Sequence, residues 1–90
     1  MENGETRVAV IGIVVENTDS VDRLNALLHD YAPYIIGRMG IPYQKKHFNL
    51  ISIAIDAPQD TIASLAGKVG NLPGVSVKTA FSQVPGNEEN

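Results

Sequence analysis

The stretch that decides the fold is residues 7–15, Arg-Val-Ala-Val-Ile-Gly-Ile-Val-Val, whose β-branched side chains favour a β-strand. Alternate residues of a strand point to opposite faces, and here both sets are apolar. The first set comprises Val8, Val10 and Val14, and the second comprises Ala9, Ile11, Ile13 and Val15. A strand that is apolar on both faces is typical of the centre of a sheet that is covered on both sides.

Two amphipathic helices are expected after this strand. The first covers residues 20–31, with Asp19 or Ser20 as its cap and Pro33 as the residue that ends it. The second follows Pro58, which suits the first turn of a helix, and it ends near Gly70. Both segments repeat apolar residues at the spacing of one helix face, first Val21, Leu24, Leu27, Leu28 and Tyr31, then Ile62, Leu65, Ala66, Val69 and Leu72.

Three further strands complete the pattern. Residues 34–43 include two glycines and Pro42, which lacks a backbone donor, so this strand is expected at a sheet edge or with a bulge. After a polar hairpin at residues 44–47, residues 48–56 carry isoleucines on one face and leucine, serine and alanine on the other. Residues 75–82 alternate valine and threonine with serine, lysine and alanine and form the last strand.

The order β-α-β-β-α-β predicts an α+β, ferredoxin-like sandwich with an antiparallel sheet of order 4-1-3-2 and both helices on one face. Residues 7–83 form the domain, and the polar stretches 1–6 and 84–90 are expected to be disordered tails. Because the helices cover one face only, the other face needs a cover from outside the chain. A second copy of the chain is the simplest candidate, so we expect a homo-oligomer.

Composition excludes several classes of function. The net charge is −3 and the seven basic residues are scattered, whereas nucleic-acid binding needs a concentrated basic face. The chain has no cysteine, which excludes disulfides and thiolate-held metal sites and suits a cytoplasmic protein. The longest apolar stretch, residues 8–15, is far below the ~20 residues of a membrane helix, so no membrane partner is expected.

The loop of residues 16–19 is the first candidate ligand site. Its residues Glu16, Asn17, Thr18 and Asp19 join a central strand to the N-terminus of a helix, where free backbone N–H groups can meet a ligand. A plain capped turn explains the same residues without a ligand.

His29 and Arg38 are candidate polar contacts of the same ligand. His29 lies near the end of the first helix, where the helix dipole alone also favours a histidine. Arg38 could neutralise a carboxylate or phosphate or pair across a subunit interface, and the alternative is an exposed arginine paired with a nearby acid. Lys45, Lys46 and His47 form either a small anion site or a solvated hairpin.

No catalytic residue, metal site or cofactor is predicted. The serines lie in no motif that supplies a base and an oxyanion hole, and the glycines after the second helix do not form a phosphate loop. Two histidines without any cysteine are too few for a zinc site. We therefore expect a protein that is not an enzyme.

Residues 8–16, 24–31, 36–43, and 60–70 with 74–79 resemble the family described as iron-only hydrogenase system regulators. The most specific pieces are Arg-Met-Gly-Ile-Pro-Tyr at 38–43 and Thr-Ile-Ala-Ser-Leu-Ala-Gly-Lys at 61–68. The resemblance implies an oligomer and a role in hydrogenase expression or maturation, such as transcriptional regulation.

That family is similar to the ACT-like, ligand-binding C-terminal domain of the nickel-responsive repressor, which implies an ACT-like fold here. The repressor domain binds nickel with histidines of its second strand and a cysteine, whereas residues 39–43 of this chain read Met-Gly-Ile-Pro-Tyr. A nickel site is therefore not expected. The repressor also has a DNA-binding arm before this domain, whereas six polar residues precede the first strand here, so direct DNA binding is not expected.

The leading hypothesis is a non-enzymatic regulatory domain that forms a dimer or tetramer through the open sheet face or a sheet edge. It senses a small-molecule effector or docks on a partner. The alternative is a protein–protein interaction module without a small ligand.

Overall fold

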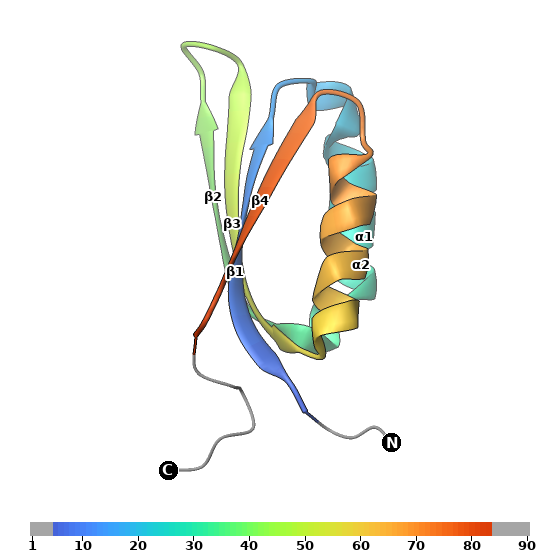
Figure 1. The fold of residues 1–90 in the computed structure, drawn as a ribbon. Helices are drawn as coiled ribbons and strands as arrows, with labels where there is room; N and C mark the ends of the chain where they lie inside the picture. The colour runs from blue at the N-terminus through green and yellow to red at the C-terminus, as the bar shows by residue number, and fades with distance from the viewer. Residues whose placement is uncertain (1–4, 84–90) are drawn as a thin grey trace.

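The computed structural model describes residues 5–83, which form a four-stranded antiparallel sheet with two helices on one face (Figure 1). The elements are β1 (Arg7–Val15), the 3-10 turn η1 (Thr18–Ser20), α1 (Val21–Asp30), the 3-10 turn η2 (Ala32–Tyr34), β2 (Ile35–Tyr43), β3 (Phe48–Ala57), α2 (Gln59–Gly70) and β4 (Val75–Phe81). The strand order β2-β3-β1-β4 is the predicted order read from the opposite edge. The ferredoxin-like α+β fold is therefore confirmed.

In the register of the sheet, residues that share a face lie opposite one another on neighbouring strands. Ile11 at the centre of β1 lies opposite Ile53 of β3 and Thr79 of β4. The pairing of β2 with β3 shifts between Ile35 and Gly37. The second strand is thus both an edge strand and a bulged one, in agreement with its glycines and proline.

The core lies between the sheet and the two helices. Its fully buried side chains come from alternate positions of β1 and β3 and from the inner faces of the helices: Ile11, Val15, Leu24, Ile53, Ile55, Ile62, Leu65 and Val69. Burial of each side chain of this size contributes about 1.5–3 kcal/mol. The apolar side chains that the helical and strand spacings predict therefore pack in one layer on the helix side of the sheet.

The start of α1 differs from the prediction. Ser20 occupies the N-cap position, but its hydroxyl donates to the carbonyl oxygen of Pro73 at 2.7 Å instead of capping the helix. Asn17 caps the preceding turn, since its Oδ1 accepts the N–H of Asp19 at 2.9 Å. Ser20 is therefore at the predicted N-cap position, but its side chain does not cap α1, because the buried hydroxyl bonds to the α2–β4 loop. A cap by Asp19 is wrong, because Asp19 lies in the preceding 3-10 turn.

Two other predictions concern the start of α2 and the two ends of the chain. Pro58 stands just before α2 rather than in its first turn, with an extended ψ of 146°. The expected tails, residues 1–6 and 84–90, lie outside the described residues except for Glu5 and Thr6, which belong to no helix or strand.

Tyr31 connects the two helices on their outer side. Its hydroxyl lies 2.9 Å from the hydroxyl of Ser64, and the ammonium of Lys68 lies 5.3 Å from the centre of its ring. The hydrogen bond with Ser64, assisted by Lys68, holds the pKa of Tyr31 below its usual value. The link joins residues 33 positions apart in the sequence.

A test of this link is the Ser64→Ala variant. Because the largest cause of the lowered pKa is removed, the pKa of Tyr31 should rise toward the ordinary tyrosine value. An ultraviolet absorbance titration measures it, and the Tyr31→Phe variant identifies which of the three tyrosines contributes the step. An unchanged titration in Ser64→Ala would contradict the link.

Gly74 fixes the turn between α2 and β4. Its φ of +69° suits glycine, and a Cβ at this position would lie 2.6 Å from the Cβ of Asn17. Its carbonyl oxygen also accepts the N–H of Glu16 at 2.7 Å. The turn therefore holds the β1–α1 loop against the α2–β4 loop.

Gly74→Ala should lower the free energy of unfolding by about 2 kcal/mol, because it combines a left-handed backbone with a clash. Gly67→Ala is the matched control: a Cβ there meets no atom within 4 Å, and alanine in a helix is favoured by up to about 1 kcal/mol. Urea unfolding measures both. Equal midpoints for the two variants would disprove the role of Gly74.

Candidate functional site

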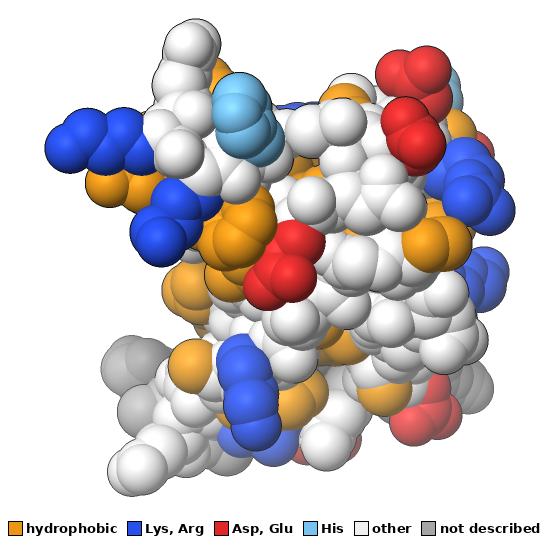
Figure 2. Space-filling view, turned by 90° about the horizontal axis from the view of Figure 1, so that it is seen from above, with side chains coloured by type: hydrophobic (Ala, Val, Ile, Leu, Met, Phe, Trp, Pro, Cys, Tyr) orange, Lys and Arg blue, Asp and Glu red, His pale blue; other side chains and the backbone are white. Residues whose placement is uncertain are grey.

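The sheet face that points away from the helices is apolar and, within residues 5–83, has no covering element (Figure 1). Val10 of β1 is 46% exposed, and Met39 and Ile41 of β2 are 61% and 53% exposed. Val8 and Leu50 lie on the same face and are also exposed. Seen from above, apolar side chains lie along this side, at the left of Figure 2. The structure thus confirms that β1 is apolar on both faces and covered on one.

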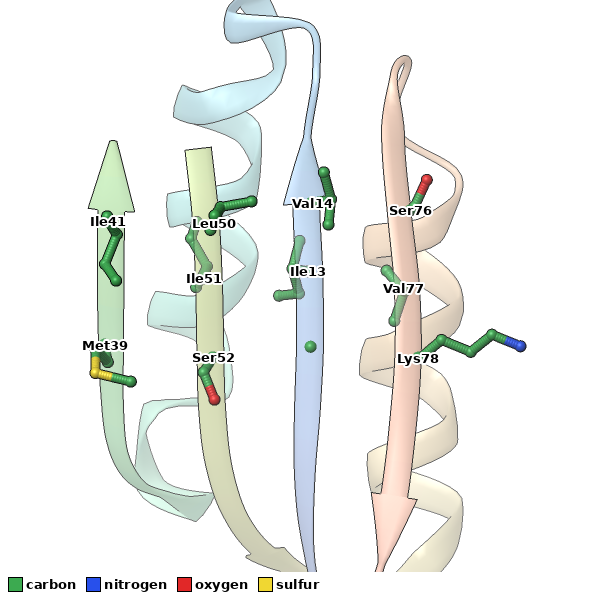
Figure 3. A pocket seen from close by; sticks show the side chains of 11 residues that line it. Ile13, Val14, Met39, Ile41, Leu50, Ile51, Ser52, Ser76, Val77 and Lys78 are labelled. Atoms are coloured by element: carbon green, nitrogen blue, oxygen red, sulfur yellow. The ribbon is translucent and has the colours of Figure 1, made fainter. Parts of the chain in front are cut away.

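Gly12 lines a hollow in this face. The hollow has a volume of about 400 Å³, and Val14, Met39, Ile41 and Leu50 are among its lining residues (Figure 3). An added Cβ at Gly12 would have its nearest neighbour, the carbonyl oxygen of Lys78, at 3.8 Å, which is an ordinary contact. The backbone therefore does not require glycine here, and the missing side chain opens the hollow.

Two opposite charges stand on the same apolar face. Asp56 pairs with Val8 in the sheet register, and Lys78 pairs with Gly12, so both side chains belong to the face that carries Val8 and Gly12. Both residues are exposed. Figure 3 shows the Lys78 side chain pointing sideways from β4 and away from the middle of the hollow. The apolar face is therefore flanked by one acidic and one basic group. We call this surface the open sheet face.

A second hollow lies on the other side of the sheet, between α1 and β2. It has a volume of about 430 Å³ and is lined by Asn25, Leu28, His29, Ala32, Ile35 and Arg38. A neighbouring hollow of about 200 Å³ shares Asn25 and Arg38, and its other lining residues are Val21, Gly40, Ile41, Pro42, Asn49 and Ile51. We call these two neighbouring hollows the Arg38 groove.

Arg38 stands in the middle of this groove. It lies opposite Ile53, a core residue, so its side chain belongs to the helix side of β2. The guanidinium Nη2 donates to Oδ1 of Asn25 on α1 at 3.2 Å. In the part of the chain that the structure describes, its side-chain partner is thus a neutral amide and not the nearby acid of the alternative interpretation.

The structure brings His29 and Arg38 together in the Arg38 groove, whose lining does not include residues 16–19. His29 lies in the last turn of α1 and lines the Arg38 groove. Glu16, Asn17, Thr18 and Asp19 are exposed before the start of α1, and α1 alone extends about 12 Å from Val21 to His29. The ligand role of residues 16–19 stays a prediction.

The hairpin between β2 and β3 carries Lys45, Lys46 and His47. All three are exposed, and basic side chains gather over the hairpin at the upper left of Figure 2. Within residues 5–83, no group of three His, Asp or Glu side chains lies close enough to hold a metal ion. No helix among those residues is long and apolar enough to cross a membrane.

Comparison with solved structures supports the fold and the resemblance. The uncharacterized protein TM1266 from Thermotoga maritima is 32% identical with a TM-score of 0.84, and the match covers 88% of this chain and 100% of that one. The C-terminal domain of the MgtC protein from Mycobacterium tuberculosis has a TM-score of 0.68 at 10% identity, covering 92% and 95% of the two chains. A formyltetrahydrofolate deformylase from Pseudomonas putida KT2440 has a TM-score of 0.59 at 11% identity, covering 81% of this chain and 28% of that one. The last two show a shared fold alone.

The family comparison covers most of the chain. No curated protein matches it. The predicted ACT-like relation to the nickel repressor is not tested by these comparisons and stays a prediction. The model of the family described as "TM1266-like: Iron-only hydrogenase system regulator, putative" matches residues 7–79. The chain therefore belongs to the TM1266-like family of iron-only hydrogenase system regulators.

Proposed function

We propose that the chain is a non-enzymatic regulatory subunit of an iron-only hydrogenase system, acting in the cytoplasm as a homo-oligomer joined through the open sheet face. The observation that carries this proposal is the exposure of Val10, Met39, Ile41 and Leu50 on one continuous face. Soluble monomers rarely expose large contiguous apolar patches, and such patches mark interaction surfaces.

The size of the open sheet face supports a stable contact. Four strands at ~4.8 Å spacing and about eight residues at ~3.3 Å per residue give a face of roughly 400–500 Å² per copy. Two such faces bury roughly 800–1,000 Å² in total, and the upper end of this range reaches the lower limit of specific interfaces. The hollow at Gly12 offers space in which side chains of the facing copy can pack.

The charges of the face favour a second copy as the occupant. In a twofold-symmetric contact, each residue of one copy meets a different residue of the other, and the second contact repeats the first. Asp56 on β3 and Lys78 on β4 can therefore pair reciprocally across the interface, at two places. The rest of the face is apolar or small, so it leaves few charges to desolvate.

The small size of the domain makes such an association useful. A domain of this length buries only somewhat over ~60% of its unfolded surface, so its stability is marginal. Association that selects the folded chain raises the apparent stability by mass action.

A regulator of this kind acts by binding. The lack of any motif that joins a nucleophile to a base supports the non-enzymatic role.

The Gly12→Asp variant tests the assembly. It places a charge in the middle of the open sheet face without a clash, since the nearest atom to the new Cβ lies at 3.8 Å. We expect light scattering after gel filtration to give a multiple of 9.7 kDa for the wild-type chain and 9.7 kDa for the variant.

Gly67→Asp is the matched control, because Gly67 lies on α2, away from the sheet face, with no atom within 4 Å of an added Cβ. It should keep the wild-type mass. A wild-type mass of one chain at a concentration where circular dichroism shows a folded protein would refute the proposed assembly.

A further inference from the structure

We propose that the Arg38 groove binds a small organic carboxylate with an apolar body, and that Arg38 holds the carboxylate. The inference gives a ligand class to the proposed regulatory function and depends on that function only for its biological purpose. The larger hollow of the groove lies on the helix side of β2, and the open sheet face lies on the other side, while Ile41 of the edge strand β2 borders both the smaller hollow and the open sheet face.

The charge of the groove carries the first step. Its lining includes a guanidinium and an imidazole, and none of its lining residues is acidic. Arginine has five N–H donors, and in the described part of the chain the side-chain partner of Arg38 is the amide of Asn25 alone. The remaining donors can form the two parallel hydrogen bonds by which a guanidinium holds a carboxylate.

Asn25 sets the direction of the guanidinium. Its Oδ1 accepts one N–H of Arg38 at 3.2 Å, from the face of α1 that also carries His29 one turn later. This bond directs the guanidinium of Arg38 toward α1, where the groove lies. A ring N–H of His29 can donate to the same carboxylate, because a neutral imidazole still has one donor.

The apolar wall of the groove defines the rest of the ligand. Leu28, Ala32 and Ile35 line the larger hollow beside the two basic groups. Its volume of about 430 Å³ is within the range of small-molecule sites. Inorganic phosphate would satisfy the guanidinium but would leave this wall bare. A carboxylate with a short branched or aromatic body satisfies both.

The experiment is a ¹H–¹⁵N NMR titration of the full chain with 4-methylpentanoate, its neutral analogue 4-methylpentanamide and inorganic phosphate. We expect 4-methylpentanoate to shift the amide signals of Asn25, His29 and Ile35, and the other two probes to bind more weakly. Arg38→Gln should weaken binding of 4-methylpentanoate roughly tenfold or more, as expected for loss of a charge-assisted pair. Ala32→Asp places a negative charge in the hollow, which repels the carboxylate of the ligand. This variant should therefore also weaken binding of 4-methylpentanoate.

Arg23→Gln is the matched control, since Arg23 is exposed on the same helix but does not line the groove. It should bind like the wild-type chain. Equal affinity of Arg38→Gln, equal binding of the amide or phosphate, or no shifts at tens of millimolar 4-methylpentanoate would overturn the proposal.

The oligomer test and this test give separate answers. Gly12→Asp, which removes the proposed assembly, should still bind 4-methylpentanoate, because Gly12 lies on the opposite face of the sheet. Loss of binding in a folded Gly12→Asp chain, or shifts confined to β1 and β4 of the open sheet face or to residues 16–19, would place the ligand elsewhere and overturn the assignment.

Discussion

The rest of the structure depends on one constraint of layer packing: two helices cover one face of a four-stranded sheet and leave the other face to solvent or to a partner. On the helix side, this produces a core in which Ile11, Ile53 and Ile55 are fully buried. On the other side, the same strands present Val10 and Leu50 to the surface. Exposure of the apolar residues of the open face to water is unfavourable. Both faces of β1 contribute to stability through apolar burial only in an arrangement in which the open face is also covered.

Much of the fold could be predicted from the sequence because local and long-range signals agree. The two-sided apolar pattern of residues 7–15 defines a central strand, and Pro42 defines an edge strand. The hydrogen bond of the Ser20 hydroxyl could not be predicted, because its partner is the carbonyl oxygen of Pro73, 53 residues further along the chain. Short polar residues at a helix start have several possible partners, and only the packing of loops selects one.

The candidate site was predictable in part. The sequence indicates Arg38 and His29 as possible polar contacts of a ligand, but it gives no sign that α1 brings them to one groove with Asn25. The hollow on the open face was missed. Its signal is Gly12, the one small residue in the alternate set with Val8, Val10 and Val14, and a glycine within a strand indicates a place where another group approaches closely.

We thus propose separate roles for the two faces of the sheet, in which the open sheet face joins copies and the opposite side holds Arg38 for a ligand. The most direct test of an assembly through the open sheet face is isotope-filtered NMR on a mixture of labelled and unlabelled chains. It observes the methyl groups of Met39, Ile41 and Leu50. We expect contacts from these methyl groups to protons of the other copy. Contacts to water alone, or contacts between copies confined to the helices, would contradict it.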